Sequence, residues 1–144
     1  MKLRAAVFFL IWAFSVDCGA LVVDSELSGE FHTLLGECGL HVATISKISM
    51  VDRVDDANGR AYLNYVGTPF EECHIDIARW AWDLRSSQSR RRLLVHEILH
   101  CSGFKHVDGP EGDWMLASSP SDQDYVAKYW EANKAKYCLQ EKYE

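Results

Sequence analysis

The sequence predicts a single α+β domain, and three observations predict it. The chain has 144 residues, of which 48% are hydrophobic, and this is the composition of a globular protein of one-domain length. Apolar residues recur at helical spacing soon after residue 20 and again in the last third of the chain, whereas the stretch between alternates apolar and polar residues. A helix, several strands and then two helices is the element order of an α+β domain.

Residues 1–20 stand apart from this domain, because they are predicted to be a secretory signal peptide. MKLR is a short basic start, AAVFFLIWAF is an uninterrupted apolar run, and SVDCGA ends on small residues. The apolar run is too short to span a membrane, which takes about 20 residues. Cleavage after Ala20 would leave residues 21–144 as one secreted or periplasmic domain. A lipid anchor at Cys18 is the alternative, and it fits less well because Asp17 precedes that cysteine.

The first half of the domain is predicted to be a helix followed by strands. Residues 25–37, SELSGEFHTLLGE, begin with a capping serine and carry leucine and phenylalanine at helical spacing. Cys38-Gly39 is typical of a helix end. Residues 40–51 alternate and are rich in β-branched side chains, so they predict a strand. After an Asn58-Gly59 turn signal, residues 61–67 predict a second strand, which would form a hairpin with the first.

The second half begins with one more strand and continues with helices. Residues 73–80, CHIDIARW, alternate again and predict a third strand. From Ser87, SQSRRRLLVHEILHC combines a serine cap with good helix formers, and Gly103 is expected to end this helix because glycine adopts positive φ without strain. Residues 104–120 hold two prolines and two glycines with little periodicity, which indicates a loop.

A C-terminal helix is predicted after this loop. Ser121 with Asp124 resembles a capping box. The run that follows, up to Tyr143, places a mostly apolar stripe on one helix face, and its members are Val126, Trp130, Asn133 and Tyr137.

Three of the six histidines fall within VHEILHCSGFKHV, residues 95–107. His96 and His100 are four residues apart, so they lie on one face of a helix and can both reach one point. Gly103 can turn the chain so that His106 returns as a third ligand. Three protein ligands with one open position are the arrangement of catalytic zinc. The sequence therefore predicts one zinc ion on these three histidines.

Glu97 directly follows the first of these histidines, so its carboxylate can reach the water-bearing side of the metal. Zinc lowers the pKa of bound water toward about 7, and a carboxylate beside that water can act as general base. The same carboxylate can pass the proton on to a leaving amine. Glu97 is therefore the predicted catalytic residue.

The stretch HEILHCSGFKH, from His96 to His106, matches H-E-x-x-H-x-x-G-x-x-H and so resembles the signature of the metzincin zinc peptidases. Met115, in DWMLAS, resembles the methionine turn beneath the metal in that clan. The resemblance implies a small matrixin-like peptidase domain with a mixed twisted sheet, an N-terminal helix, a zinc-binding helix and a C-terminal helix. It also implies a substrate-pairing edge strand, for which residues 61–67 are the candidate. Ala117 stands where some members carry a tyrosine ligand, so no tyrosine switch is expected.

The function that this resemblance implies is an exported zinc endopeptidase that acts on peptide or protein substrates. Two alternative hypotheses of function remain. One is a non-catalytic zinc-stabilised module that binds another protein, and the other is a zinc hydrolase of a non-peptide amide. The formal net charge of −6 becomes −7 once Lys2, Arg4 and Asp17 leave with the signal peptide. An acidic chain favours neither nucleic acid nor anionic membranes as partner, and no membrane insertion is expected after cleavage.

Four cysteines remain when Cys18 is removed, and an even number in an exported chain predicts two disulfides. Of the three possible pairings, we prefer Cys38 with Cys73 and Cys101 with Cys138. Although Cys101 follows a predicted ligand, it points about 100° away around the helix, so a disulfide is expected there rather than a metal bond.

The remaining histidines, His32, His41 and His74, lack ligand spacing and are expected to be structural or to lie at the surface. Ligand histidines usually donate their second ring N–H to an acceptor. Three acids are candidates for that acceptor: Asp76, Asp108 and Asp113.

Overall fold

The computed structural model describes residues 19–118 and 121–138 of the chain. The predicted signal peptide lies outside these residues except for its last two positions, and the alternative anchor at Cys18 lies outside them as well.

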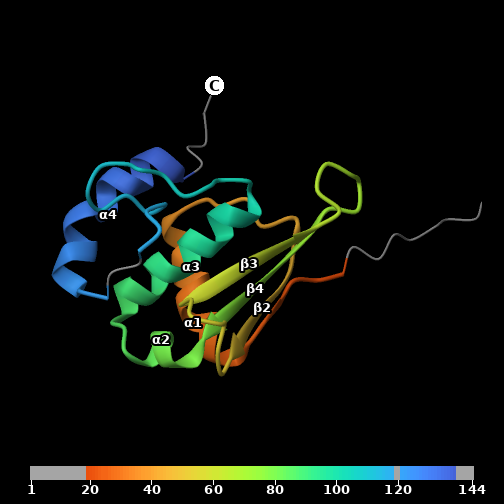
Figure 1. Cartoon of the computed structure of the whole chain (residues 1–144), viewed down its shortest axis with the longest axis horizontal. Helices are drawn as coiled ribbons and strands as arrows, with labels where there is room; N and C mark the ends of the chain where they lie inside the picture. Colours follow the sequence, from red (N-terminus) through yellow and green to blue (C-terminus); the bar gives the residue numbers. More distant parts are fainter. Residues whose placement is uncertain (1–18, 119–120, 139–144) are drawn as a thin grey trace, which may run out of the picture.

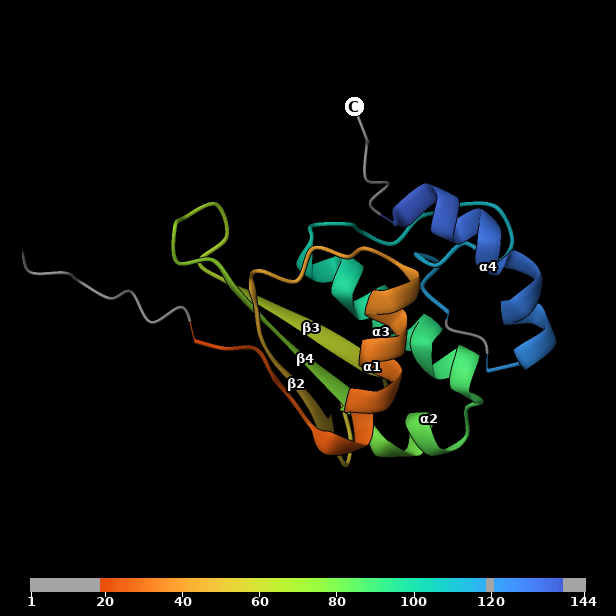
Figure 2. The ribbon, with the colours of Figure 1, turned by 180° about the vertical axis from the view of Figure 1, so that it is seen from behind.

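The described chain is a mixed α+β fold, as the sequence predicts, with four helices and one four-stranded sheet. The elements in chain order are β1 (Val22–Val23), α1 (Ser25–Glu37), β2 (Ile45–Val51), β3 (Gly59–Asn64), β4 (Glu72–Ala78), α2 (Arg79–Asp83), α3 (Ser87–Cys101) and α4 (Gln123–Tyr137). Helices α1 and α3 pack side by side against the sheet, and α4 lies on the far side of α3 (Figures 1 and 2). Helix α3 is therefore the central layer of the molecule.

The sheet has the strand order β1-β2-β4-β3, in which β1, β2 and β4 run parallel and β3 is antiparallel to β4. The predicted hairpin between residues 40–51 and 61–67 is wrong, because β4 lies between β2 and β3. Strand β4 buries Ile75 and Ile77 completely, which suits a strand paired on both sides. Strand β3 is only partly buried, which suits a sheet edge.

Most boundaries lie within a few residues of those predicted. The first predicted strand begins at Ile45 rather than at residue 40, and the third ends at Ala78, where the short helix α2 begins. Each of the two later helices is capped one residue away from the predicted position. Ser86 accepts a hydrogen bond from Ser89 N, and Asp122, not Ser121, accepts one from Tyr125 N at 2.7 Å.

Helix α4 buries the predicted stripe, namely Val126, Trp130, Asn133 and Tyr137. The helix ends at Tyr137, and the predicted extension beyond residue 138 lies outside the described residues. The core between the sheet and the helices is aliphatic and aromatic, and it includes Leu27, Phe31, Leu34, Ile48, Ile75, Ile77, Leu94, Val95 and Ile98.

Two disulfides use the four cysteines of the described residues, but the predicted pairing is wrong. Cys38 bonds to Cys138 and Cys73 bonds to Cys101, with Cα–Cα distances of 4.9 and 5.7 Å. The ends of α1 and α4 meet in space although they are 100 residues apart in sequence, and β4 packs against α3 so that Cys73 reaches the end of that helix. Two disulfides are typical of an oxidising compartment. Within the described ranges, no helix combines the length and the hydropathy that a membrane crossing requires.

Candidate metal centre

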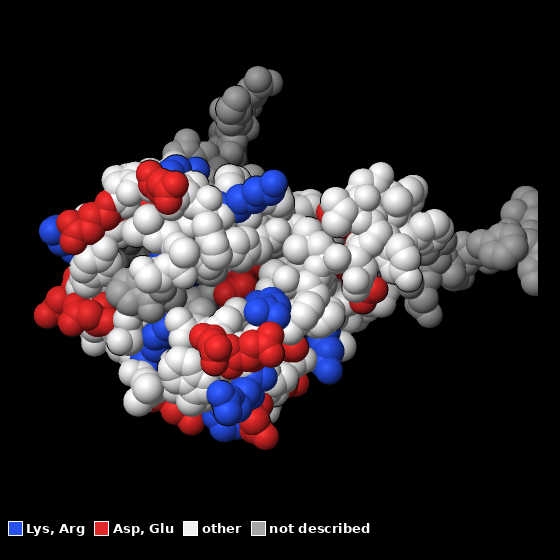
Figure 3. Space-filling model, in the orientation of Figure 1, with Lys and Arg blue, Asp and Glu red and all other residues white. Residues whose placement is uncertain are grey.

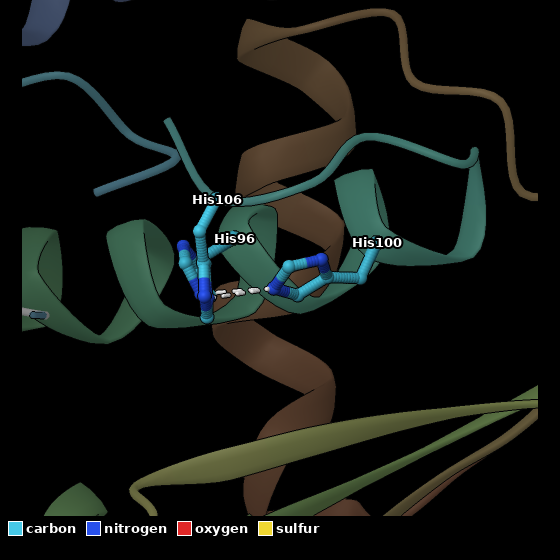
Figure 4. Close-up of side chains that lie close together, drawn as sticks. All are labelled: His96, His100 and His106. Carbon is cyan, nitrogen blue, oxygen red and sulfur yellow. Dashed lines mark hydrogen bonds between the residues drawn. The ribbon is translucent and has the colours of Figure 1, made fainter. Parts of the chain in front are cut away.

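His96 and His100 on α3 and His106 in the loop that follows turn their rings toward one another (Figure 4). The Nε2 atoms form a triangle with sides of 3.2, 3.1 and 3.2 Å. A tetrahedral zinc ion with bonds of 2.0–2.1 Å holds its nitrogen ligands about 3.3–3.4 Å apart. The triangle is therefore within a few tenths of an ångström of the size that one ion requires.

The local backbone explains how three histidines so close in sequence reach one point. One helical turn separates His96 from His100. The helix ends at Cys101, and Gly103, just past its cap, has a φ of 88°, in the left-handed region that glycine tolerates, as predicted. The returning chain is fixed by a hydrogen bond of 3.0 Å from Val107 N to Met115 O, which holds the residues after His106 beside the Met115 loop.

The hydrogen-bond partners of the Nδ1 atoms show which nitrogen of each histidine ring carries the proton. His96 Nδ1 lies 2.6 Å from Trp114 O, and His100 Nδ1 lies 2.8 Å from Phe104 O. A carbonyl oxygen only accepts, so both Nδ1 atoms carry hydrogen and each neutral ring presents a bare lone pair at Nε2. Two such lone pairs 3.2 Å apart repel each other unless a cation lies between them. The arrangement of these rings is thus suited to a metal ion.

Backbone carbonyls therefore orient His96 and His100, and the acids predicted for this role do not. Asp113, one of the three acids, instead accepts hydrogen bonds from Met115 N, Lys136 Nζ and Tyr137 Oη. Backbone carbonyls are among the acceptors to which metal-binding histidines donate their second ring N–H.

Burial keeps the first two histidines neutral. His96 is 5% exposed, and burial lowers its pKa to about 4, even though the hydrogen bond to Trp114 O acts in the opposite direction. Burial also lowers the pKa of His100, which is half-buried. Neutral imidazole is the form that binds metal, so these two residues need to lose no proton at pH 7. His106 is exposed, which leaves one side of the triangle open to solvent.

Glu97 lies in the same cleft as the three histidines. The cleft has a volume of about 770 Å³ and runs between α3 and the edge strand β3. Glu97 is 4% exposed, and burial raises its pKa to about 7, while a hydrogen bond from the Ala61 backbone acts in the opposite direction. A carboxyl group with a pKa near neutrality can both take and return a proton at pH 7.

Met115 is fully buried in the core, directly after the residue whose carbonyl holds His96. Sequence reasoning missed the residues that fix this loop. Asn133 Oδ1 accepts from Trp114 N at 2.9 Å, and Asn133 Nδ2 donates to Gly112 O at 2.8 Å. Arg92 Nη2 donates to Asp113 O and Ser118 O. The one available signal was Asn133 itself, a polar residue in the apolar stripe of α4.

The other histidines lie away from this cluster. His32 is exposed on α1 and interacts with Ser28, His41 is exposed, and His74 stacks on Tyr62 with ring centroids 4.4 Å apart. In residues 19–118 and 121–138, the three histidines at 96, 100 and 106 are the one group of His, Cys, Asp or Glu side chains placed to share a metal ion.

The surface around the cleft is mixed in charge. On the face drawn in Figure 3, acidic and basic side chains are interspersed, and the loop between β3 and β4 projects as a mostly uncharged lobe. Its exposed apolar residues are Tyr65, Val66 and Phe70, of which Val66 also lines the cleft.

In comparisons with known proteins, no family model, no curated sequence and no solved structure matches this chain. The site is therefore characterised by its own geometry, which is one buried and one half-buried neutral histidine, a third exposed histidine and an adjacent buried carboxyl group.

Proposed function

We propose that this protein is an exported zinc-dependent endopeptidase of the metzincin type. The observation that carries the proposal is the facing pair of bare Nε2 lone pairs of His96 and His100, with His106 completing the triangle and Glu97 in the same cleft. The spacing H-E-x-x-H-x-x-G-x-x-H supports the assignment to this clan. The signal-like leader and the two disulfides support export.

A zinc ion on the three histidines would supply a Lewis acid with one open position for water or a substrate carbonyl. The remaining chemistry belongs to Glu97. It accepts a proton from the attacking water as the water oxygen bonds to the carbonyl carbon. It then donates that proton to the amine nitrogen as the carbon–nitrogen bond breaks. In the metal-free site burial raises the pKa of Glu97 to about 7, and the positive charge of a bound zinc ion would lower this value and favour the carboxylate that accepts the proton.

The edge strand supports a polypeptide as substrate. Strand β3 lines the cleft and pairs with β4 on one side only among the described strands. An extended peptide can pair with the main chain of such an edge and lie across the cleft. This placement is the one that the resemblance implies for residues 61–67, and β3 covers the first four of them.

The test uses residues 21–144, produced with both disulfides, loaded with zinc and incubated with a peptide library. The matched control is Glu97→Gln, which keeps the size of the side chain and removes the base. We expect peptide cleavage by the wild type and a loss of about 10²–10⁴-fold in the variant, with zinc content unchanged. Equal cleavage by both proteins would refute the role of Glu97.

The same experiment separates the two rival functions. A non-catalytic binding module would bind zinc and cleave no peptide. Its capture of a protein partner would not change in Glu97→Gln. Hydrolysis of small acyl amides, but of no peptide in the library, would indicate a non-peptide amidase. In both cases His96, His100 and His106 keep their role as ligands.

A further inference from the structure

We propose that the start of β3 forms a main-chain seat for Glu97, in which Gly59 is a positioning residue because its missing side chain leaves room for the carboxylate. This inference rests on the proposed function, since it concerns the residue that would move the proton. The seat consists of residues 59–61, which line the cleft. They belong to β3, the strand that packs against α3 (Figure 1).

The space beside Gly59 is already filled. A Cβ atom at this position would lie 3.1 Å from Glu97 Oε1, 3.0 Å from Ile77 Cδ1 and 3.2 Å from Asp76 O. All three distances are shorter than ordinary van der Waals contact, which is about 3.5–4.0 Å between carbon atoms. Any other residue at position 59 would therefore push on the Glu97 carboxylate, on β4 or on both.

Backbone conformation does not explain a glycine at this position. The described glycines with positive φ are Gly67, Gly103 and Gly112, and Gly59 is not among them. A residue with a side chain could adopt the backbone angles of Gly59, but its Cβ atom would lie so close to three neighbouring atoms that they would have to give way by a few tenths of an ångström. The glycine is therefore explained by the close approach of Glu97 and β4, and glycine in a strand often marks such a close approach.

The strand register shows why the main chain of β3 can hold a carboxylate. Gly59 pairs with Ile77 and Ala61 with Ile75, and Ala78 N donates to Asn58 O at 2.9 Å. Hydrogen-bonded and non-hydrogen-bonded pairs alternate in an antiparallel ladder. Asn58 and Arg60 thus direct their main-chain groups toward β4, whereas Gly59 and Ala61 direct theirs outward into the cleft.

The outward N–H of Ala61 faces Glu97, and a hydrogen bond from the Ala61 backbone acts to lower the pKa of this carboxyl group. The carboxylate therefore lies beside the strand, near the Ala61 backbone and 3.1 Å from the position that a Cβ atom at Gly59 would take. Glu97 is 4% exposed, so this main-chain seat, rather than solvent, determines where the carboxylate points. A displacement of 1 Å in a catalytic group can cost about 10²-fold in rate, so a shift of a few tenths is expected to cost about tenfold.

The experiment compares Gly59→Ala with wild type on a peptide that the wild type cleaves. We expect kcat to fall about tenfold, with KM within about twofold and zinc content unchanged, because the methyl group moves the base and leaves the ligands in place. A second variant, Gly59→Ala with Ile77→Val, removes the Cδ1 atom that the new methyl group would also meet. In this double variant, thermal stability should return toward that of Ile77→Val alone while kcat stays low.

Three results would overturn the inference. The first is a wild-type kcat in Gly59→Ala, and the second is a rise in KM with kcat unchanged, which would assign Gly59 to substrate contact. The third is a return of kcat together with stability in the double variant, which would assign the loss to folding.

A crystal structure of zinc-loaded Gly59→Ala tests the seat without any cleavage assay. We expect the Glu97 carboxylate to have moved away from Ala61 N, and an unmoved carboxylate would refute the inference. If the wild type cleaves no peptide, the proposed function fails, and this structure still decides whether Gly59 positions Glu97.

Discussion

The two walls of the cleft are held in different ways. The α3 wall presents side chains, and each of its two histidines, His96 and His100, is oriented by a carbonyl from a later part of the chain. The β3 wall presents main chain, and its described pairing is to β4 alone. Substitutions that shorten side chains are therefore expected to disturb the α3 wall. Substitutions that add a side chain, as at Gly59, are expected to disturb the β3 wall.

The α3 wall also depends on residues far away in sequence. Asn133 of α4 holds the main chain of Trp114, and the Trp114 carbonyl in turn holds His96. Asp113 joins the same loop to the end of α4 through Lys136 and Tyr137. Helix α4 thus supports the histidine cluster without contributing a residue to it.

The largest expected difference between the two walls is in zinc affinity, and His100→Ala tests it. Loss of one of three ligands should weaken zinc binding by roughly a hundredfold to a thousandfold, because structural zinc sites gain roughly 3–4 kcal/mol for each ligand. Gly59→Ala, on the other wall, should leave the zinc Kd unchanged. Competition with a chelator of known affinity measures both values. A shift of less than tenfold for His100→Ala would remove this residue from the ligand set.

The next contrast comes from the two disulfides, each removed by paired Cys→Ala substitutions. Loop closure predicts about 4.7 kcal/mol for Cys38–Cys138, which spans 100 residues, and about 3.6 kcal/mol for Cys73–Cys101, which spans 28. Zinc affinity should show the reverse order, since Cys73–Cys101 ties β4 to the end of α3, next to His100. Urea unfolding and chelator competition measure the two effects. If removal of Cys38–Cys138 lowers zinc affinity more than removal of Cys73–Cys101 does, the bond at Cys101 does not hold the histidines in place.

Part of the candidate site is predictable from the sequence, whereas the disulfide pairing is not. His96, His100 and the turn at Gly103 are predictable because helical spacing and the conformational freedom of glycine are local properties. The cysteine pairing and the position of β4 between β2 and β3 depend on which elements pack together, and no local pattern records that. The acceptors for the ligand histidines are carbonyls of Trp114 and Phe104, and every residue has a carbonyl, so their side chains give no sign of the role.

A smaller effect is expected from Asn133→Leu, which keeps the side-chain volume but leaves Trp114 N–H and Gly112 C=O without their partner. Unpaired buried groups of this kind cost about 1–3 kcal/mol. Zinc affinity should also fall by about tenfold, since the Trp114 carbonyl would no longer be fixed beneath His96. Glu131→Ala, at an exposed position of the same helix, is the matched control and should change neither quantity. Loss of stability with zinc affinity intact would mean that α4 supports the fold but not the site.

The smallest effect concerns the pH dependence of stability at Asp113. Burial raises the pKa of this carboxyl group, but hydrogen bonds from Lys136, Tyr137 and Met115 N outweigh burial and bring the net pKa below its usual range. The folded protein therefore binds this proton less tightly than the unfolded chain does. The stabilisation is fully present above the unfolded pKa, about 3.9, and is lost as the pH falls through the lower folded value.

Asp113→Asn should accordingly be less stable than wild type at pH 7, and the difference should shrink as the pH falls below about 4. Urea midpoints measured from pH 7 to pH 3 on zinc-free protein would show this, because release of metal in acid would otherwise add its own pH dependence. The protonation of His96 in acid is common to both proteins and cancels in the difference. A difference that stays constant over this range would mean that α4 holds the loop through shape alone, and that the charge on Asp113 does not help to support the wall that carries the ligands.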